Sequence, residues 1–124
     1  EEAGIIAAVH AGWRGLVADI IPKTIERMIE MGASAERIKV GIGPSLGFSC
    51  AEFSDPLNEI PQKYHYGVHG RNVDLNGIAL KQLEEAGVKQ IEHFDICTKC
   101  DASWPSFRRD GTKERFATII SLHE

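Results

Sequence analysis

A histidine near the amino end of the chain is the first residue whose surroundings favour chemistry. His10 follows an apolar run and opens the sequence HAGWRG at residues 10–15. Glycines let a metal or ligand come close to the backbone, imidazole can ligate a metal or transfer a proton, and Arg14 adds a fork of donors suited to phosphate. In the alternative interpretation, His10 only hydrogen-bonds a loop carbonyl while Trp13 packs and Arg14 forms a surface ion pair. The residues by themselves leave both interpretations open.

The three cysteines form a second set of candidate groups. Cys50 ends a glycine-rich segment, residues 41–50, whose spacing is not that of a Walker loop and which lacks the following lysine. Cys97 and Cys100 form a Cys-x-x-Cys pair with His93 upstream, and such a pair can bind zinc or cycle as a dithiol. A structural zinc site normally has four ligands, and the sequence contains no second cysteine pair. We therefore interpret Cys50 as a small packed side chain and favour a packing or incidental role for the pair.

A pair of arginines, Arg108 and Arg109, is the last candidate group. On an extended segment two adjacent side chains cannot face the same way, so we expect one to point inward, to a site or to Asp110, and the other to be solvated. An ordinary structural ion pair is the alternative. The remaining histidines, His65, His69 and His123, lie in polar or terminal stretches, and we expect them to be solvated.

The elements that must position these groups follow from apolar periodicity and from capping residues. The pattern predicts strands at 5–9, 38–42, 91–94 and 116–122, a helix from Leu16 to Gly32, a short helix at 56–60, and a helix from Asp74 to Gly87. Pro22 must kink the first helix or mark a new first turn. The order of elements predicts an α+β fold, with a mixed β-sheet packed with helices.

Length and composition narrow the class of protein. A chain of 124 residues with 43% hydrophobic residues is enough for one compact domain with a core. The net charge of −4 without a basic stripe argues against a nucleic-acid partner, and no apolar run is long enough to cross a membrane. Three cysteines, an odd number, fit reduced thiols and a cytoplasmic location. The chain opens without Met, so we expect it to begin inside a longer protein.

Five motifs in the same order and approximate spacing resemble the laccase-domain family. They are HAGWRGL at 10–16, IGPSLG at 42–47, VDL at 73–75, CT at 97–98 and FRRDG at 107–111. The resemblance implies that residues 1–124 are the carboxy-terminal portion of a single laccase domain. It also implies an incomplete laccase-domain fold, which is of the cysteine-hydrolase-like type.

The resemblance also implies a metal site, for zinc with copper as the other candidate. The family takes two histidines and a cysteine as ligands, from three separate motifs, and only the motif matched by His10 is present here. Cys50 lies on the family's Gly-Pro loop and is not the ligand cysteine. A catalytic zinc site normally has three protein ligands and an open position. We therefore expect this chain alone to be inactive, with the remaining ligands upstream of it.

The activity that the resemblance implies for the complete protein is that of a purine nucleoside phosphorylase, and some family members also deaminate adenosine. Its substrates are adenosine, inosine or guanosine together with phosphate, and its products are the base and ribose 1-phosphate. We expect Arg14 and one or both of Arg108 and Arg109 to contact the anion or substrate. Two alternatives stay open, a copper-dependent polyphenol oxidase and a non-enzymatic fragment or subunit that binds a partner chain.

Overall fold

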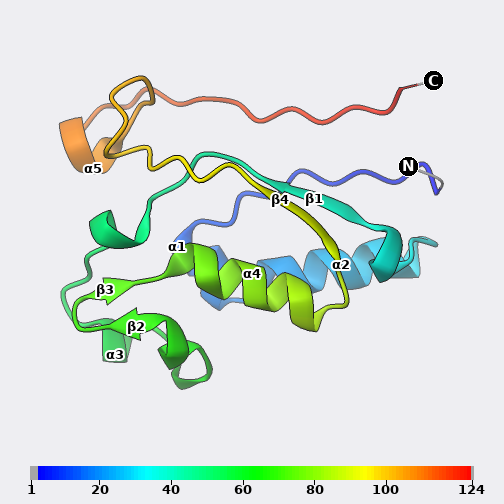
Figure 1. The fold of residues 1–124 in the computed structure, drawn as a ribbon, viewed down its shortest axis with the longest axis horizontal. Helices are drawn as coiled ribbons and strands as arrows, with labels where there is room; N and C mark the ends of the chain where they lie inside the picture. Colours follow the sequence, from blue (N-terminus) through cyan, green and yellow to red (C-terminus); the bar gives the residue numbers. More distant parts are fainter. Residues whose placement is uncertain (1–2, 124) are drawn as a thin grey trace.

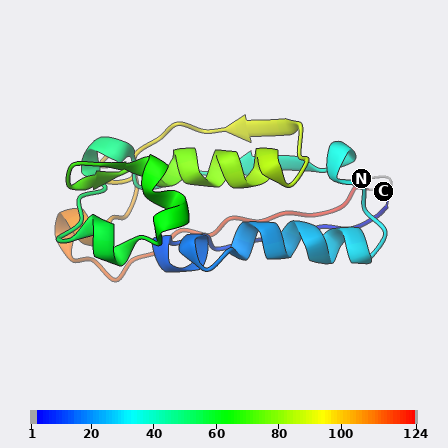
Figure 2. The ribbon, with the colours of Figure 1, turned by 90° about the horizontal axis from the view of Figure 1, so that it is seen from below.

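Two helices cover one face of a short parallel sheet in the computed structural model, which describes residues 3–123 (Figure 1). The sheet pairs β1 (Lys39–Ile42) with β4 (Gln90–His93), and α2 (Ile20–Glu30) and α4 (Leu75–Glu85) pack against it. The turned view in Figure 2 shows these two helices side by side along the length of the molecule. Their interface with the sheet buries four apolar side chains, Ile25, Ile38, Leu83 and Val88. The α+β class expected from the sequence is confirmed.

Local sequence signals set the limits of the main helices. Asp74 precedes α4 and its carboxylate accepts a hydrogen bond from the Gly77 N–H at 2.9 Å, which is an N-terminal cap. Gly87 follows α4 with a φ of +89° and Gly32 follows α2 with a φ of +111°. Only glycine adopts such angles without strain, so both glycines end their helices as the sequence predicted.

The helix expected from Leu16 to Gly32 is two helices, α1 (Trp13–Val17) and α2. The break falls at Asp19, which has a left-handed φ of 65° and whose carboxylate accepts hydrogen bonds from Tyr64 and from Lys63, the latter at 2.6 Å. Pro22 lies in the first turn of α2, where its missing N–H costs nothing. Of the two alternatives expected at Pro22, a kink or a new first turn, the structure shows the second.

A second group of elements packs against α1 and the amino end of α4. It surrounds a core that includes Leu16, Phe53 and Ile78. The single mixed sheet expected from the sequence is instead two separate two-stranded sheets, β1 with β4 and an antiparallel pair of short strands that also bridges Glu52 through Asn72. The short elements of the chain are η1 (Ala35–Arg37), η2 (Phe48–Cys50), α3 (Pro56–Glu59), η3 (Gln62–Gly67), β2 (Val68–His69), β3 (Asn72–Val73) and α5 (Phe107–Asp110).

The two terminal segments differ from the expectation. Residues 5–9 and 116–122 were expected to be strands, but neither is paired into a sheet within the described part of the chain. Both run along the length of the molecule without helix or strand, and Figure 1 shows them reaching the same end of it. The expectation was wrong because an apolar run supplies a strand-like surface but not the neighbouring strand that must accept and donate its hydrogen bonds.

Among the helices of residues 3–123, none is both long and apolar enough to span a lipid bilayer.

Candidate functional site

The His10 motif forms a tight turn that leads into α1. The ring of His10 lies over Gly12, since a Cβ added to Gly12 would come within 3.0 Å of the imidazole Nε2 atom. The N–H of Leu16 closes the first helical turn on the Gly12 carbonyl at 2.8 Å. His10 is exposed, which leaves its ring open to a metal or substrate. The absence of a side chain at Gly12 therefore permits this ring position.

The motif is fixed to the rest of the molecule through Trp13. Its ring meets that of Phe53 edge-on, with centroids 5.3 Å apart, and the guanidinium of Arg14 lies 4.8 Å from the Trp13 ring centroid. Phe53 also contacts Arg108, whose guanidinium lies 5.5 Å from the ring centroid and which donates to the Glu52 carbonyl at 2.8 Å. Phe53 thus brings Arg14 and Arg108, which are 94 positions apart in the sequence, to the same side of the fold.

Arg109 contacts a different part of the fold from Arg108 and is largely enclosed, with 25% of its side chain exposed. The segment that carries both is the short helix α5, not the extended segment assumed from sequence. Arg109 pairs with Asp110 at 2.9 Å. Its other N–H groups donate to the backbone carbonyls of Thr98, Lys99, Asp101 and Trp104 at 2.8 to 3.3 Å. All five guanidinium N–H groups are engaged, so Arg109 holds the 98–104 loop in place.

The loops that follow β1 and β4 meet at one end of the parallel sheet. Ser45 forms an isolated parallel bridge with Cys97: its N–H donates to the Ile96 carbonyl at 3.0 Å and its carbonyl accepts from the Thr98 N–H at 2.9 Å. The N–H of Gly47 then donates to the Cys97 sulfur at 3.3 Å. The pairing of the strands therefore continues into the loops and fixes them against each other.

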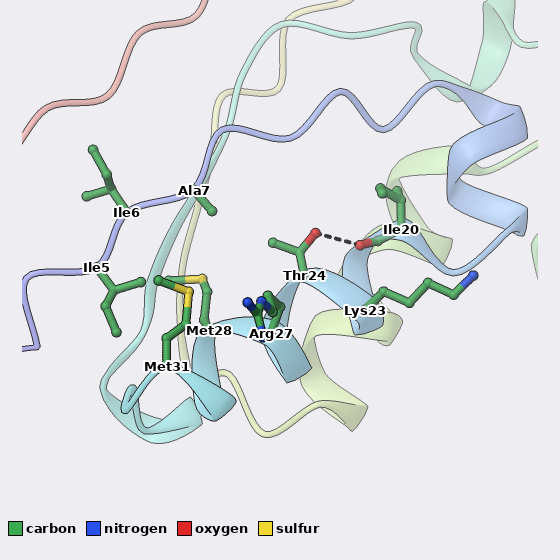
Figure 3. Close-up of a pocket in the computed structure, with 9 residues that line it drawn as sticks. All are labelled: Ile5, Ile6, Ala7, Ile20, Lys23, Thr24, Arg27, Met28 and Met31. Atoms are coloured by element: carbon green, nitrogen blue, oxygen red, sulfur yellow. Dashed lines mark hydrogen bonds between the residues drawn. The ribbon is translucent and has the colours of Figure 1, made fainter.

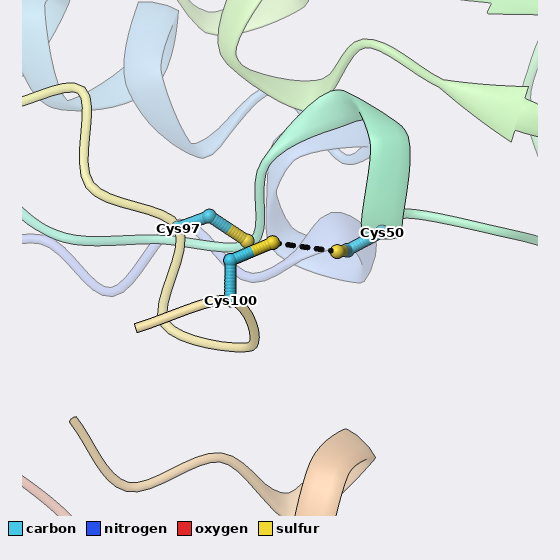
Figure 4. Close-up of side chains that lie close together, drawn as sticks. All are labelled: Cys50, Cys97 and Cys100. Carbon is cyan, nitrogen blue, oxygen red and sulfur yellow. Dashed lines mark hydrogen bonds between the residues drawn. The ribbon is translucent and has the colours of Figure 1, made fainter. Parts of the chain in front are cut away.

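This arrangement gathers all three cysteines (Figure 4). The sulfurs of Cys50 and Cys100 are 3.2 Å apart in a thiol hydrogen bond, and the three sulfurs lie within 4.8 Å of one another, close enough to hold a metal ion. Partial burial alone raises the pKa of the Cys97 thiol, but N–H groups of Cys100, Gly47 and Lys99 outweigh it and lower the pKa to about 7. The thiols of Cys50 and Cys97 raise the pKa of Cys100 to about 11.

The sequence interpretation of the cysteines as packing residues did not anticipate this cluster. The available signal was topological. Cys50 follows the first paired strand and Cys97 follows the second, and carboxyl ends of parallel strands share one edge of a sheet. Predicting that β1 and β4 pair in parallel would have placed Cys50 beside the Cys-x-x-Cys pair.

The histidines stay apart from this cluster. Within residues 3–123, the group of side chains close enough to hold a metal is the three cysteines, and it includes neither His10 nor His93. His93 has a buried Nε2 atom without a hydrogen-bond partner among the described residues. His69 is exposed, His65 contacts the Ile60 carbonyl at 2.8 Å, and His123 is exposed. His10 alone therefore does not complete the metal site that the resemblance implies.

An apolar pocket of about 360 Å³ separates the amino-terminal segment from α2 (Figure 3). It does not include His10 or any of the three arginines named from the sequence. The segment contributes Ile5, Ile6 and Ala7, and α2 with its C-cap contributes Ile20, Lys23, Thr24, Arg27, Met28 and Met31. The pocket is a loosely packed apolar seam, separate from the candidate metal-binding and anion-binding side chains.

The same residues carry similarity to known proteins. A family model described as multi-copper polyphenol oxidoreductase laccase matches residues 1–123. A purine nucleoside phosphorylase of Aquifex aeolicus is 37% identical over 118 residues, which cover 94% of this chain and 56% of that protein. A purine nucleoside phosphorylase of Deinococcus radiodurans is 33% identical over 131 residues, covering 98% of this chain and 50% of that protein.

A third relative bears a different name. Adenosine deaminase RL5, from an unknown prokaryotic organism, is 35% identical over 123 residues, covering 89% of this chain and 47% of that protein. The chain spans about half the length of the curated relatives it matches.

Proposed function

The chain belongs to the multi-copper polyphenol oxidoreductase laccase family, and we propose that the protein containing it is a purine nucleoside phosphorylase. The observation that carries the proposal is the similarity of nearly the whole chain to relatives with that name. Adenosine deamination is proposed as a second activity of the same protein, supported by the relative named for it. The three free cysteines support a reducing compartment, the cytoplasm.

Phosphorolysis sets two demands that the arginines of this chain can meet. A phosphate oxygen forms a bond to the anomeric carbon of ribose, the carbon–nitrogen bond to the base breaks, and its electron pair leaves with the base, which takes up a proton. Fixed cationic donors stabilise the charge that is present in the phosphate and develops in the reaction. Arg14 and Arg108 are proposed as these donors, because both are exposed and lie on the Trp13–Phe53 ring pair.

Arg109 is proposed to act differently. Its guanidinium has no N–H left for an anion, so it serves as a positioning residue that holds the loop after β4. This divides the three arginines named from the sequence into two that are free to meet a substrate and one that supports the structure around them.

His10 is proposed as one ligand of a zinc site whose other ligands lie outside residues 3–123. The exposed ring over Gly12 supports this role. The described residues do not complete a three-ligand site around it. Copper is the alternative metal, since it binds nitrogen and sulfur ligands more tightly than zinc.

The terminal segments support a proposed partner for this chain. Their apolar side chains are exposed, with 42% of Ile6, 40% of Phe116 and 87% of Ile119 accessible, and their backbones are unpaired. We propose that further polypeptide of the same domain packs on them, for which the greater length of the relatives leaves room. A chain that stays monomeric in light scattering and does not bind the unmatched half of the Aquifex relative would contradict this partner.

The test of the proposed function compares the 124-residue chain with a protein of the relatives' length that contains it. After zinc loading, the longer protein should release free base from inosine, adenosine or guanosine only when phosphate is present, with an equal yield of ribose 1-phosphate. Arg14→Ala should raise the KM for phosphate, while Arg71→Ala, an exposed arginine paired with Glu52 at 3.2 Å, serves as the matched control. Release of no base from any of the three nucleosides would refute the proposal, and phenol oxidation lost on copper removal would favour the oxidase alternative.

A further inference from the structure

The structure assigns a metal site to the three cysteines, and we propose that Cys50, Cys97 and Cys100 together bind a thiophilic d10 cation, Zn²⁺ or Cu⁺. Three sulfurs within 4.8 Å of one another can reach one ion, because a zinc–sulfur bond is about 2.3 Å long. The group excludes His10. The site is therefore separate from the one that the family resemblance implies.

The cluster is held by backbone contacts that do not depend on a metal. The Ser45–Cys97 bridge joins the two loops, and Gly47 approaches Cys97 so closely that an added Cβ would lie 3.3 Å from the sulfur. The Cys50 N–H donates to the Gly47 carbonyl at 3.0 Å. The three cysteine positions are thus fixed in the two loops before an ion binds. This lowers the loss of conformational entropy on metal binding.

The loop that carries Cys97 and Cys100 has its own support. The Asp101 N–H donates to the Cys97 carbonyl at 2.9 Å, which closes the turn between the two cysteines. Arg109 ties the same turn to α5 through the carbonyls on either side of it. Arg109 donates to four carbonyls of residues 98–104, which indicates that the geometry of this loop is specified.

The chemistry of three thiols selects soft cations. Each thiol that coordinates gives its proton to solvent and forms one metal–sulfur bond, so binding releases protons without oxidation or reduction. Cu⁺ is satisfied by sulfur ligands alone, whereas Zn²⁺ takes a fourth ligand such as water. Cys100 is exposed while the other two are half-buried, so the ion has an approach from solvent and an open side for that ligand.

Cobalt titration of the reduced chain tests the proposal, because Co²⁺ bound by thiolates has an intense sulfur-to-metal charge-transfer absorption in the near ultraviolet. One equivalent of Co²⁺ should produce that absorption, and one equivalent of Zn²⁺ should abolish it. A parallel titration with Cu⁺ under anaerobic conditions shows which of the two ions displaces the other. No charge-transfer absorption in the fully reduced chain would overturn the proposal.

Variants locate the site. Cys50→Ser, Cys97→Ser and Cys100→Ser should each weaken zinc binding more than about 100-fold, since loss of an outer-shell partner alone costs about 10- to 100-fold. Gly47→Ala should weaken binding about 10-fold because its methyl group meets the Cys97 sulfur, whereas Gly41→Ala has open space and should bind normally. His10→Ala should also bind normally. Absorption that survives Cys97→Ser but disappears in His10→Ala would assign the metal to the other site.

A measurement on the unmodified chain covers the case in which a variant fails to fold. Zinc should protect all three cysteines from alkylation, and intact-mass analysis counts the modified thiols. Three alkylated cysteines in the presence of zinc would overturn the proposal, as would a Cys50–Cys100 disulfide that forms and persists under thiol reductant. Failure of phosphorolysis would leave these readouts unchanged, so the two proposals fail separately.

Discussion

Replacing Arg109 with alanine should loosen the 98–104 loop while leaving the main core folded. The side chain donates to four backbone carbonyls and pairs with Asp110, with 25% of its surface exposed. A hydrogen bond to a charged group contributes about 1.5 to 3 kcal/mol when buried. These carbonyls can hydrogen-bond to water once the arginine is gone. The net stabilisation lost is therefore roughly 0.5 to 1 kcal/mol for each of the four hydrogen bonds, about 2 to 4 kcal/mol in total.

Native-state hydrogen exchange of the loop measures this loss directly. Three amides report on it, because the N–H groups of Thr98, Asp101 and Trp104 donate to the carbonyls of Ser45, Cys97 and Asp101, respectively, at 2.9 to 3.2 Å. A local opening energy lower by about 2 to 4 kcal/mol raises their exchange by roughly 30- to 700-fold, since 1.4 kcal/mol is tenfold. The exchange rates in Arg109→Lys should lie between those of the unmodified chain and those of Arg109→Ala, because lysine keeps the charge but lacks the planar fork of donors.

The neighbouring arginine supplies the control. Arg108 is exposed, donates to one carbonyl and contacts one ring, so Arg108→Ala should change exchange of the 98–104 loop by less than about tenfold. Equal exchange in the two variants would refute the assignment of Arg109 as the residue that holds the loop.

Three further perturbations test other parts of the structure. Hydrogen bonds from Lys63 and Tyr64 lower the pKa of the Asp19 carboxyl in the folded state below its ordinary 3.8. The ionised carboxylate therefore stabilises the fold above pH 3.8, and this stabilisation is lost as the pH falls through the folded-state pKa. Acid titration of unfolding should therefore show a loss of under about 1 kcal/mol that is absent in Asp19→Asn, and equal curves would contradict it. Gly67→Ala places a Cβ 2.8 Å from a carbon of the fully buried Ile78 and should destabilise by about 1 to 3 kcal/mol in urea unfolding, whereas Gly41→Ala should change little. Gly12→Ala should displace the His10 ring and lower kcat/KM for phosphorolysis by the longer protein, with little change in its free energy of unfolding. An unchanged kcat/KM would count against the proposed role of His10 in the site.

The parts of the fold that were predictable depend on residues close in sequence. Asp74 and Gly87 define α4 because capping is decided within one helical turn. The break at Asp19 was not predictable, since the residues that hold its left-handed backbone, Lys63 and Tyr64, come from η3 more than 40 positions away. Gly32 could indicate only where α2 ends.

Strand pairing marks the same limit. The apolar segment at 38–42 found a partner in β4, but the equally apolar segments at 5–9 and 116–122 did not within the described residues. An apolar run indicates that a segment prefers burial, but it does not indicate which neighbouring strand the segment pairs with. The cysteine cluster was missed for that reason, because it exists only once β1 and β4 lie parallel in the observed register.

The short helix α5 connects the two groups of residues that could carry chemistry, the His10 motif and the three cysteines. Its adjacent arginines diverge: Arg108 lies on Phe53 beside the ring of the His10 motif, and Arg109 holds the cysteine-bearing loop. The Ser106 side chain caps this helix by accepting the Arg109 N–H at 3.3 Å. From these contacts we expect a displacement of the cysteine loop to move α5, and with it the Arg108 guanidinium, relative to Trp13. Metal binding by the three cysteines and anion binding near His10 are thus expected to be coupled through one four-residue helix.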